Sequence, residues 1–457
     1  MKRIITLFLL VLLLGSCKKY LELKIPSTQL TGEAIFRSDV TATAAMLAIY
    51  TQMESSGFIY NLFVITGTSA DELRNHRSAT DAIAAHSNSL TPENSYVNSF
   101  WTNLYKYIYQ CNAILSGVER STALSGEVAD QLRGEALFLR AWCHFYLAAL
   151  FENVPYVTGI DPEQNTILQQ QQSKDIYLFL VADLQEAISL LSPDYVTAAN
   201  RPGGERVRPN RYAAAALLSR VHLYLGNWTE AGEQASSVLN NTAQYGLVTN
   251  LQEVFLKNSK EAIWQLQPVL SRFNSYAGAN LNGTNTIPNI TSLSLNLVDS
   301  FEANDLRRMD WTRQTTAGSV VYTWPHKFKV GQNAPAITEH TVVLRLAEVI
   351  LTRAEAYAMQ NKLLEAMADL NAIRQRAGLP PVSSVTKGEI IQAIHKERRM
   401  ELFAEYGDRW IDLRRTGKID EVMIPVKGAE WNSADALYPI PLNEMLRHPG
   451  MRQNAGY

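Results

Sequence analysis

The chain has 457 residues, and its 42 Lys and Arg residues against 44 Asp and Glu give a formal net charge of −2. A charge so close to zero argues against a nucleic-acid-binding protein, which presents a strongly basic surface. The length allows one to three domains, and 20 Tyr and 8 Trp residues supply aromatic surface that a sugar-binding protein could use if some of it is exposed.

The first residues have the pattern of an export signal. A short basic stretch precedes an apolar run at residues 4–14, which is too short to cross a bilayer and has the length of a signal-peptide core. The run leads into Leu14-Gly15-Ser16-Cys17, the order of a bacterial lipobox. We therefore expect residues 1–16 to be a signal peptide and residues 17–30 to be a tether lipidated at Cys17. The alternative is an ordinary secretory signal with a chance cysteine.

Beyond the tether, the spacing of apolar residues is mostly helical. In residues 131–151, for example, apolar side chains recur every three or four positions along one face. This period predicts an all-α, mostly helical fold, in which Cys111 and Cys143 are buried free thiols rather than a disulfide. The predicted helices cover about 98–118, 131–151, 175–191, 211–225, 344–360 and 388–406.

Two of the predicted helix pairs resemble each other. A helix, a tight turn at an asparagine and a second helix is the plan of a tetratricopeptide unit, which buries its apolar face by stacking on neighbouring units. A chance likeness between leucine-rich helices is the alternative. The first pair carries Arg220, Tyr224, Gly226-Asn227 and Glu230-Ala231, and the second carries Arg353, Tyr357, Gln360-Asn361 and Glu365-Ala366.

Two regions lack a clear helical period. Residues 55–95 and 240–340 contain stretches rich in Asn, Gly, Ser and Thr, and loops of this kind on a rigid scaffold often carry the binding surface. We expect residues 31–240 to form an N-terminal helical region and residues 241–457 a C-terminal region that is rich in loops as far as 340. Both are expected to pack as one globular body.

The densest charged cluster lies near the C-terminus. Glu397, Glu401 and Glu405 share one helix face, and paired carboxylates are the catalytic groups of glycoside hydrolases. Interleaved arginines, however, favour helix-neighbour ion pairs and lower the pKa of a carboxyl group, the opposite of what a general acid needs. We therefore predict structural ion pairs for Glu397, Arg398, Glu401, Glu405, Arg409 and Asp412.

No catalytic or metal-binding motif is recognisable. No pair of histidines has a helix-face metal spacing, and there is no phosphate-binding loop or dinucleotide fingerprint. The sequence therefore predicts neither an enzyme nor a bound cofactor, although a structural calcium ion in a loop stays open.

Several sequence blocks in a fixed order resemble the SusD/RagB family. The blocks are spread over nearly the whole mature chain, so that their joint order is more specific than any one of them. They include Tyr20-Leu21-Glu22, Arg133-Gly134-Glu135-Ala136-Leu137-Phe138-Leu139-Arg140-Ala141, Arg374-Gln375-Arg376-Ala377-Gly378-Leu379, Arg409-Trp410-Ile411-Asp412-Leu413-Arg414-Arg415, Tyr438-Pro439-Ile440-Pro441 and Gln453-Asn454-Ala455-Gly456-Tyr457.

The resemblance implies a helical lipoprotein of the outer membrane with tetratricopeptide-like units. Such a protein binds oligosaccharides without chemistry of its own and delivers them to a SusC-like TonB-dependent transporter. Its ligand could instead be a peptide, as in the RagB branch, or another nutrient. Two further readings are an assembly scaffold without a small ligand and a glycoside hydrolase.

The membrane face is less firmly implied. Lipoproteins exported to the surface in this group often carry acidic residues directly after the lipidated cysteine, whereas Lys18 and Lys19 follow Cys17 here. The resemblance still favours the cell exterior.

A glycan binder needs exposed aromatic rings, which stack on the C–H faces of sugars, and polar neighbours for the hydroxyls. Two stretches within the irregular regions qualify by position and residue type. The alternative for each of their aromatic residues is a place in the core. The candidates are Phe58, Tyr60, Asp71, Arg74, Asn75, His76, Arg77 and Tyr96 in the first stretch, and Phe273, Tyr276, Asn280, Trp311, Tyr322 and Trp324 in the second.

Overall fold

The computed structural model describes residues 32–281, 291–383 and 386–457. The predicted signal peptide, the tether and Cys17 lie outside the described residues. The described chain is mostly helical, at 57% helix, which confirms the predicted fold class.

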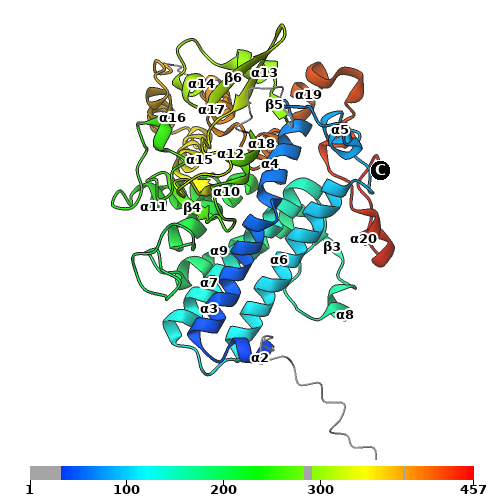
Figure 1. The fold of residues 1–457 in the computed structure, drawn as a ribbon, viewed down its shortest axis with the longest axis vertical. Helices are drawn as coiled ribbons and strands as arrows, with labels where there is room; N and C mark the ends of the chain where they lie inside the picture. The colour runs from blue at the N-terminus through cyan, green and yellow to red at the C-terminus, as the bar shows by residue number, and fades with distance from the viewer. Residues whose placement is uncertain (1–31, 282–290, 384–385) are drawn as a thin grey trace, which may run out of the picture.

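Three long helices form one half of the body. Helices α3 (Asp39–Ser55), α6 (Ser95–Arg120) and α7 (Gly126–Phe151) pack against one another and run along the long axis (Figure 1). Helix α6 begins at Asn94, whose side chain accepts hydrogen bonds from the backbone N–H groups of Tyr96 and Val97, the usual arrangement of an asparagine at a helix N-terminus. Every residue of α7 from 134 to 151 is buried, so α7 is the central helix of the fold.

The two predicted tetratricopeptide-like pairs stack directly on each other. The first consists of α10 (Arg211–Leu225) and α11 (Trp228–Leu239), and the second of α15 (Leu346–Met359) and α16 (Leu363–Arg376). Helix α11 packs against α15, where Gln360 Nε2 donates a hydrogen bond to the carbonyl of Trp228 at 2.8 Å. The prediction of packed helix pairs is confirmed.

The turns of the two pairs differ by one residue. In the first, Gly226 takes the left-handed conformation at φ 74°, directly after the last helical residue. In the second, Gln360 comes before the left-handed residue, which is Asn361 at φ 61°. Glycine and asparagine are the residues that most readily take this conformation at a helix end, so different residues end the two equivalent helices.

The remaining elements are short, apart from α4, α9 and α17. Region 55–95 contains α4, so the expectation of an irregular segment is wrong for residues 58–69. The other helices are α2 (Gly32–Ile35), α4 (Phe58–Ser69), α5 (Thr80–His86), α8 (Pro162–Asn165), α9 (Ser173–Leu190), α12 (Tyr276–Leu281), α13 (Leu295–Ser300), α14 (Leu306–Asp310), α17 (Lys387–Leu402), α18 (Asp408–Arg415), α19 (Ile419–Lys427) and α20 (Leu442–Arg447).

Short antiparallel strand pairs interrupt the helices. In the described part of the chain, β1 (Leu73–Asn75) pairs with β5 (Thr291–Leu293), β2 (Val154–Pro155) with β3 (Gln170–Gln171), β4 (Ala262–Leu266) with β8 (Thr341–Arg345), and β6 (Thr312–Ala317) with β7 (Val320–Pro325). Strands β4 to β7 come from the predicted loop-rich region 240–340, and β8 begins directly after it. The β5 strand and the β6–β7 hairpin lie together at the end of the body opposite α2 (Figure 1).

The core is continuous across both halves of the sequence. Its main cluster contains buried residues from Ala42 to Met451, and Trp142 and Trp264 lie at ring contact inside it. Cys111 and Cys143 are buried and free, as predicted. A second cluster around Trp311 and Phe403 lies beneath the strand-rich end.

Candidate functional site

The two stretches predicted to bind ligand meet in the fold. Strand β1 from the first stretch pairs with β5 from the second, with Arg74 opposite Ser292. Strand β5 in turn packs against β7. This pairing brings residues more than 200 positions apart to one surface.

A first group of contacts forms around Tyr322. The His76 ring meets the Tyr322 ring edge to face at 5.5 Å between centroids, and His76 Nε2 lies 2.9 Å from Ser292 Oγ. The loop before α5 is held in shape by the Asn75 side chain, which accepts a hydrogen bond from the backbone N–H of Arg77 at 3.0 Å. Tyr322, His76 and Arg77 are all partly exposed.

A second group of contacts forms around Tyr276. Its ring stacks on Tyr60 at 6.3 Å and meets Phe273 edge to face at 4.9 Å, and its hydroxyl donates to the Ser55 carbonyl at 2.7 Å. Gly57 makes this approach possible, because it is left-handed at φ 64° and a Cβ there would lie 3.1 Å from the Tyr276 ring.

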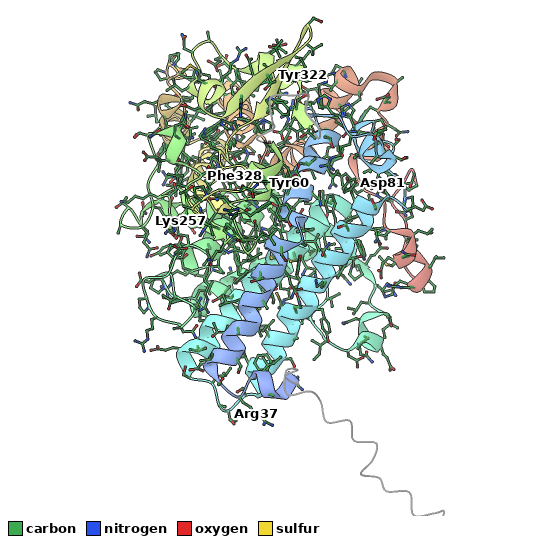
Figure 2. The ribbon with its side chains drawn as sticks, in the orientation of Figure 1. Arg37, Tyr60, Asp81, Lys257, Tyr322 and Phe328 are labelled. Atoms are coloured by element: carbon green, nitrogen blue, oxygen red, sulfur yellow. The ribbon has the colours of Figure 1, made fainter. Side chains whose placement is uncertain are left out.

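Arg77 connects the two groups. Its guanidinium donates to the Tyr96 hydroxyl at 2.7 Å. Burial raises the pKa of the Tyr60 hydroxyl to about 12, although the nearby positive charge of Arg77 opposes the shift. In Figure 2, Tyr60 lies near the middle of the body and Tyr322 towards the strand-rich end. We call Arg74, His76, Arg77, Tyr96, Tyr276 and Tyr322 the aromatic surface.

Five predicted site residues, Phe58, Tyr60, Asp71, Trp311 and Trp324, belong to the interior instead. Phe58 is 1% exposed and packs on Phe100 and Trp142, because it begins α4 rather than lying in a loop. Trp311 is 0% exposed and Trp324 4%. Their rings therefore offer no face to a ligand, and the expectation that they lie on a binding loop needs correction.

Asp71 is also buried, and its carboxylate is engaged in ion pairs within the protein. Its carboxylate pairs with Arg409 at 2.8 Å and with Arg399 at 2.7 Å. Burial alone would raise the pKa of this carboxyl group, but the two arginines hold it below the ordinary value. Tyr60 is also largely buried, at 8% exposure, and acts as the support beneath Tyr276.

Sequence reasoning missed two residues at this site. Ser292 contacts His76, and Arg313 lies opposite Trp324 in the β6–β7 ladder. Tyr322 is two residues from Trp324 and therefore points to the same face as Arg313. Alternation along residues 312–325 was the available signal, and it is weak because the strands are short.

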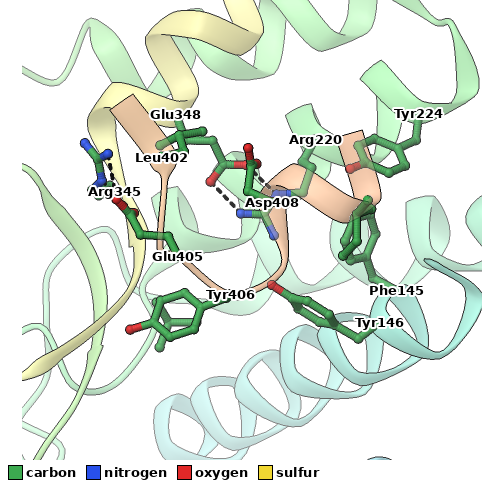
Figure 3. Close-up of a pocket in the computed structure, with 12 residues that line it drawn as sticks. Phe145, Tyr146, Arg220, Tyr224, Arg345, Glu348, Leu402, Glu405, Tyr406 and Asp408 are labelled. Carbon is green, nitrogen blue, oxygen red and sulfur yellow. Dashed lines mark hydrogen bonds and ion pairs between the residues drawn. The ribbon is translucent and has the colours of Figure 1, made fainter. Parts of the chain in front are cut away.

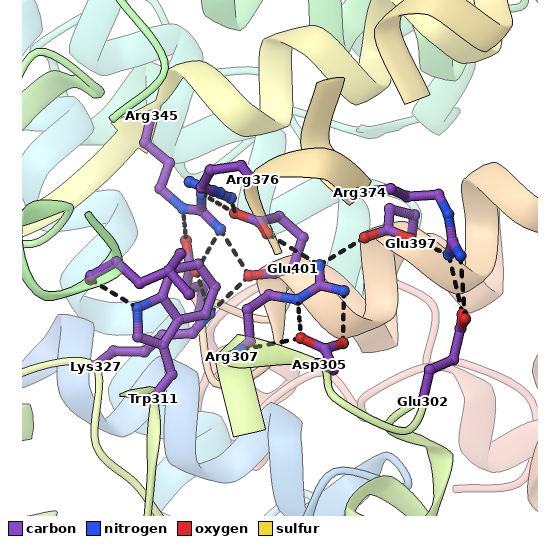
Figure 4. Close-up of polar contacts among 12 residues, drawn as sticks. Glu302, Asp305, Arg307, Trp311, Lys327, Arg345, Arg374, Arg376, Glu397 and Glu401 are labelled. Atoms are coloured by element: carbon purple, nitrogen blue, oxygen red, sulfur yellow. Dashed lines mark hydrogen bonds and ion pairs between the residues drawn. The ribbon is translucent and has the colours of Figure 1, made fainter. Parts of the chain in front are cut away.

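The C-terminal carboxylates are structural. Glu401 lies at the centre of the network in Figure 4, bonded to Arg345 at 2.6 Å, to Arg307 at 3.1 Å and also to Arg376. Glu397 pairs with Arg307 and Arg374, and Glu405 with Lys327 and Arg345. All six predicted residues make ion pairs, the other three being Arg398 with Asp408 and Asp412, Arg409 with Asp71, and Asp412 with Arg415.

The partners differ from those expected. Arg398 and Glu401 were expected to pair along one helix, but their described ion pairs reach other segments. Burial would raise the pKa of Glu401, yet its arginine neighbours lower it well below the ordinary value. A carboxyl group held ionised in this way cannot serve as a general acid at neutral pH.

A small cavity lies beside this network (Figure 3). It adjoins the ion pair between Arg220 and Glu348, which spans α10 and α15 at 2.5 Å, together with Tyr146, Tyr406 and Asp408. Its volume of about 30 Å³ is enough for one or two water molecules. An oligosaccharide does not fit there.

A much larger groove lies at the opposite end, between α3 and α6. It has a volume of about 1110 Å³ and is lined mainly by small apolar residues such as Ala45, Ala48 and Ala113. Tyr109 is a half-exposed aromatic residue in it, and Gly32, where the described chain begins, also lines it. Its lining also includes Phe36 and the polar side chains of Arg37, Gln110 and Arg120.

Neither a membrane-spanning helix nor a metal-binding cluster occurs among the described residues. No helix among them is long and apolar enough to cross a membrane. No three His, Cys, Asp or Glu side chains in this part of the chain lie close enough together to hold a metal ion.

Comparison with known protein families gives two matches. A family model described as "Starch-binding associating with outer membrane" matches residues 19–223, and the model of the SusD family matches residues 296–457. Among curated proteins, SusD-like protein P2 of Formosa agariphila is 26% identical over 99% of this chain and 99% of its own length.

Solved structures share the fold. A SusD superfamily protein from Bacteroides vulgatus aligns with a TM-score of 0.79 at 21% identity, covering 93% of this chain and 100% of that one. A protein described as a laminarin-binding SusD-like protein aligns with a TM-score of 0.75 at 22% identity, covering 92% and 99%.

Proposed function

Because this chain belongs to the SusD family of outer-membrane-associated glycan-binding proteins, we propose that it captures oligosaccharides at the cell surface and delivers them to a SusC-like TonB-dependent transporter. Members of the family are binding proteins without enzymatic activity. The buried, arginine-paired state of Glu401 agrees with that property.

The aromatic surface is the observation that supports this proposal at the level of residues. Tyr276, Tyr322 and Tyr96 are partly exposed rings. His76 lies beside Tyr322, and the Arg77 guanidinium lies beside Tyr96. Rings of this kind stack on the apolar faces of sugars, while the polar groups contact hydroxyls. The binding of laminarin by a protein of similar fold supports a glucan or a related glycan as the kind of ligand.

The lipobox at residues 14–17 supports anchoring through lipid on Cys17. With the family's association with the outer membrane, this favours a protein held at the outer membrane and facing the exterior. A tethered binding protein raises the local concentration of its ligand beside a transporter, which is the advantage of linking capture to uptake.

A binding panel tests the proposal. The full-length protein, purified in mild detergent, is titrated with laminarin, starch and acidic oligosaccharides and with a set of peptides. We expect at least one glycan to bind and Tyr276→Ala or Tyr322→Ala to weaken it by about tenfold, as for an interface residue that contributes about 1.4 kcal/mol.

Tyr109→Ala is the matched control, because Tyr109 is 50% exposed but lies in the groove at the opposite end. Binding of peptides but of no glycan would replace the oligosaccharide in this proposal by a peptide. An equal loss of glycan affinity in Tyr109→Ala and Tyr322→Ala would show that the aromatic surface is not the binding site.

A further inference from the structure

Arginines in the aromatic surface, and Arg313 beside it, form no ion pair in the described part of the chain. Arg74 and Arg313 are exposed, and Arg77 is partly exposed with its guanidinium on the Tyr96 hydroxyl. In the described part of the chain, none of the three makes an ion pair. This contrasts with Arg307, Arg345, Arg374 and Arg376, each of which is paired with a carboxylate.

The three arginines lie around the exposed rings. Arg74 is opposite Ser292 in the β1–β5 ladder, and His76, which follows this strand, contacts the same serine. His76 meets the Tyr322 ring, and Arg313 shares the face of Tyr322 on the β6–β7 hairpin. Arg77 adds its charge on the side of Tyr96.

The carboxylates nearest in sequence form no ion pair with these arginines. Asp81 and Asp310 are partly exposed, and their side chains accept hydrogen bonds from Ser95 and Gln252. Asp71 is 2% exposed and already paired with Arg399 and Arg409, and Glu72 is 3% exposed. Burial, together with the charge of Asp71, raises the pKa of Glu72 to about 8, which keeps this group protonated and uncharged at neutral pH. Among the described residues no carboxylate forms an ion pair with Arg74, Arg77 or Arg313, so their guanidinium groups remain available to a ligand.

The neighbouring histidines respond to the same charge. Burial, and then the positive charge of Arg74, lowers the pKa of His76. Burial, and then Lys329 and Arg313, lowers the pKa of His326 to about 4. The positive charges of Arg74 and Arg313 thus reach these two histidines, whereas at His86, on which Arg74 also acts, the charge of Glu430 opposes the shift of the pKa.

We propose that the ligand of the aromatic surface is an acidic oligosaccharide, whose carboxylate or sulfate groups bind Arg74, Arg77 and Arg313 while its rings stack on Tyr276 and Tyr322. This inference rests on the proposed function. The planar guanidinium binds carboxylate and sulfate oxygens in two parallel hydrogen bonds, so both kinds of acidic sugar fit the same chemistry.

Matched pairs of glycans test the charge without changing the sugar. The full-length protein is titrated with oligogalacturonate and its methyl ester, and with a sulfated galactan oligosaccharide and its desulfated form. We expect at least one acidic member to bind about tenfold or more tightly than its neutral partner, and this ratio to fall with added salt because exposed charges are screened. The two pairs distinguish a carboxylate ligand from a sulfate ligand.

The variant Arg74→Gln with Arg313→Gln should lower the ratio of acidic to neutral affinity by about tenfold, since two exposed ion pairs together contribute about 1.4 kcal/mol. Arg201→Gln is the control, because Arg201 is an exposed arginine outside the aromatic surface.

An affinity ratio close to one in both pairs of glycans, or an equal effect of the control variant, overturns the inference. If neutral glycans such as laminarin still bind, the proposed function survives. If no glycan binds, both fail.

Discussion

At the scale of single residues, burial decides which of the predicted aromatic side chains can contact a ligand. Tyr276 and Trp311 were equal candidates by residue type, but Trp311 donates its indole N–H to the Leu251 carbonyl at 3.0 Å inside the core. Lys327 lies 4.7 Å from the Trp311 ring centroid, so the ring also stabilises a buried cation. Tyr276 keeps a partly exposed face because it begins a short helix at the surface.

The variant Glu401→Gln should lower the free energy of unfolding by about 3–5 kcal/mol, because it leaves three buried arginines short of a partner. Glu421→Gln is the control, since Glu421 is a 69% exposed partner of Lys418 and should change stability by less than about 1 kcal/mol. Urea unfolding followed by circular dichroism measures both. Equal stabilities would contradict the structural role of Glu401, and glycan hydrolysis lost in the variant would point to an enzyme.

Glu54 should make stability depend on pH. It is buried and lines a small cavity together with Tyr276, and the only described hydrogen bond of its carboxyl group comes from Thr341 at 3.2 Å. Burial raises the pKa of this group to about 8 from 4.5. Between these values the native state binds more protons than the unfolded state, so stability falls as pH rises.

Glu54→Gln removes this titration, whereas Glu72, whose pKa is also raised to about 8, remains in both proteins. The melting temperature of the variant relative to wild type should therefore rise between about pH 5 and about pH 9. A constant difference would show that Glu54 is not a buried neutral acid.

At the scale of elements, two equivalent arginines of the repeated helix pairs form ion pairs with different elements. The Arg353 side chain pairs with Asp369 of its own helix pair, whereas the equivalent Arg220 reaches Glu348 of the next pair. The ion pair of Arg353 thus lies within one helix pair, whereas that of Arg220 links the two helix pairs. The helical period predicted the helices. The partner of each arginine depends instead on which neighbouring helix packs against its own helix.

Gly226→Ala should destabilise the protein by about 1 kcal/mol, because alanine disfavours the left-handed conformation at φ 74°. Gly388 provides the opposite case, since it lies in the first turn of α17 with open space around it. Gly388→Ala should raise stability by up to about 1 kcal/mol. Thermal unfolding of the two variants compares them directly, and a loss of similar size in both would argue against the conformational explanation.

At the scale of the whole molecule, the scaffold brings two distant loop regions together. The central helix α7 and the stacked pairs form one continuous core, and this core sets the positions of β1, β5 and the β6–β7 hairpin. The aromatic surface is therefore a property of the assembled body. Tyr322 lies at the end of the body opposite α2, whereas Tyr276 stacks on Tyr60 nearer the middle (Figures 1 and 2).

Replacing Cys17 by Ser should release the protein from the membrane fraction, because the thiol that takes the lipid is lost. The wild-type protein should remain with membranes and co-purify with a large β-barrel protein. Fractionation and mass spectrometry of the purified complex measure both properties. Membrane attachment of the variant would refute the lipobox prediction, and a wild-type protein that purifies with no barrel would favour an assembly scaffold over uptake.

The sequence by itself determined the helical fold, the two repeated helix pairs, the family and the presence of an ion-pair network. These features depend on local period and on motif order, which a single chain carries explicitly. The predicted export signal and Cys17 likewise follow from residues 1–17 alone. Only the tertiary structure decided that Phe58, Trp311 and Trp324 are buried while Tyr276 and Tyr322 are partly exposed.

The physical reason is that exposure and pairing depend on segments far apart in the chain. His76 reaches Tyr322, Glu401 reaches Arg307 and Arg345, and Asp71 reaches Arg409. Residue type and spacing determine what a side chain can do, whereas packing determines whether it faces the solvent or another side chain. For this protein, that difference separates the residues of the core from those that we propose to bind a glycan.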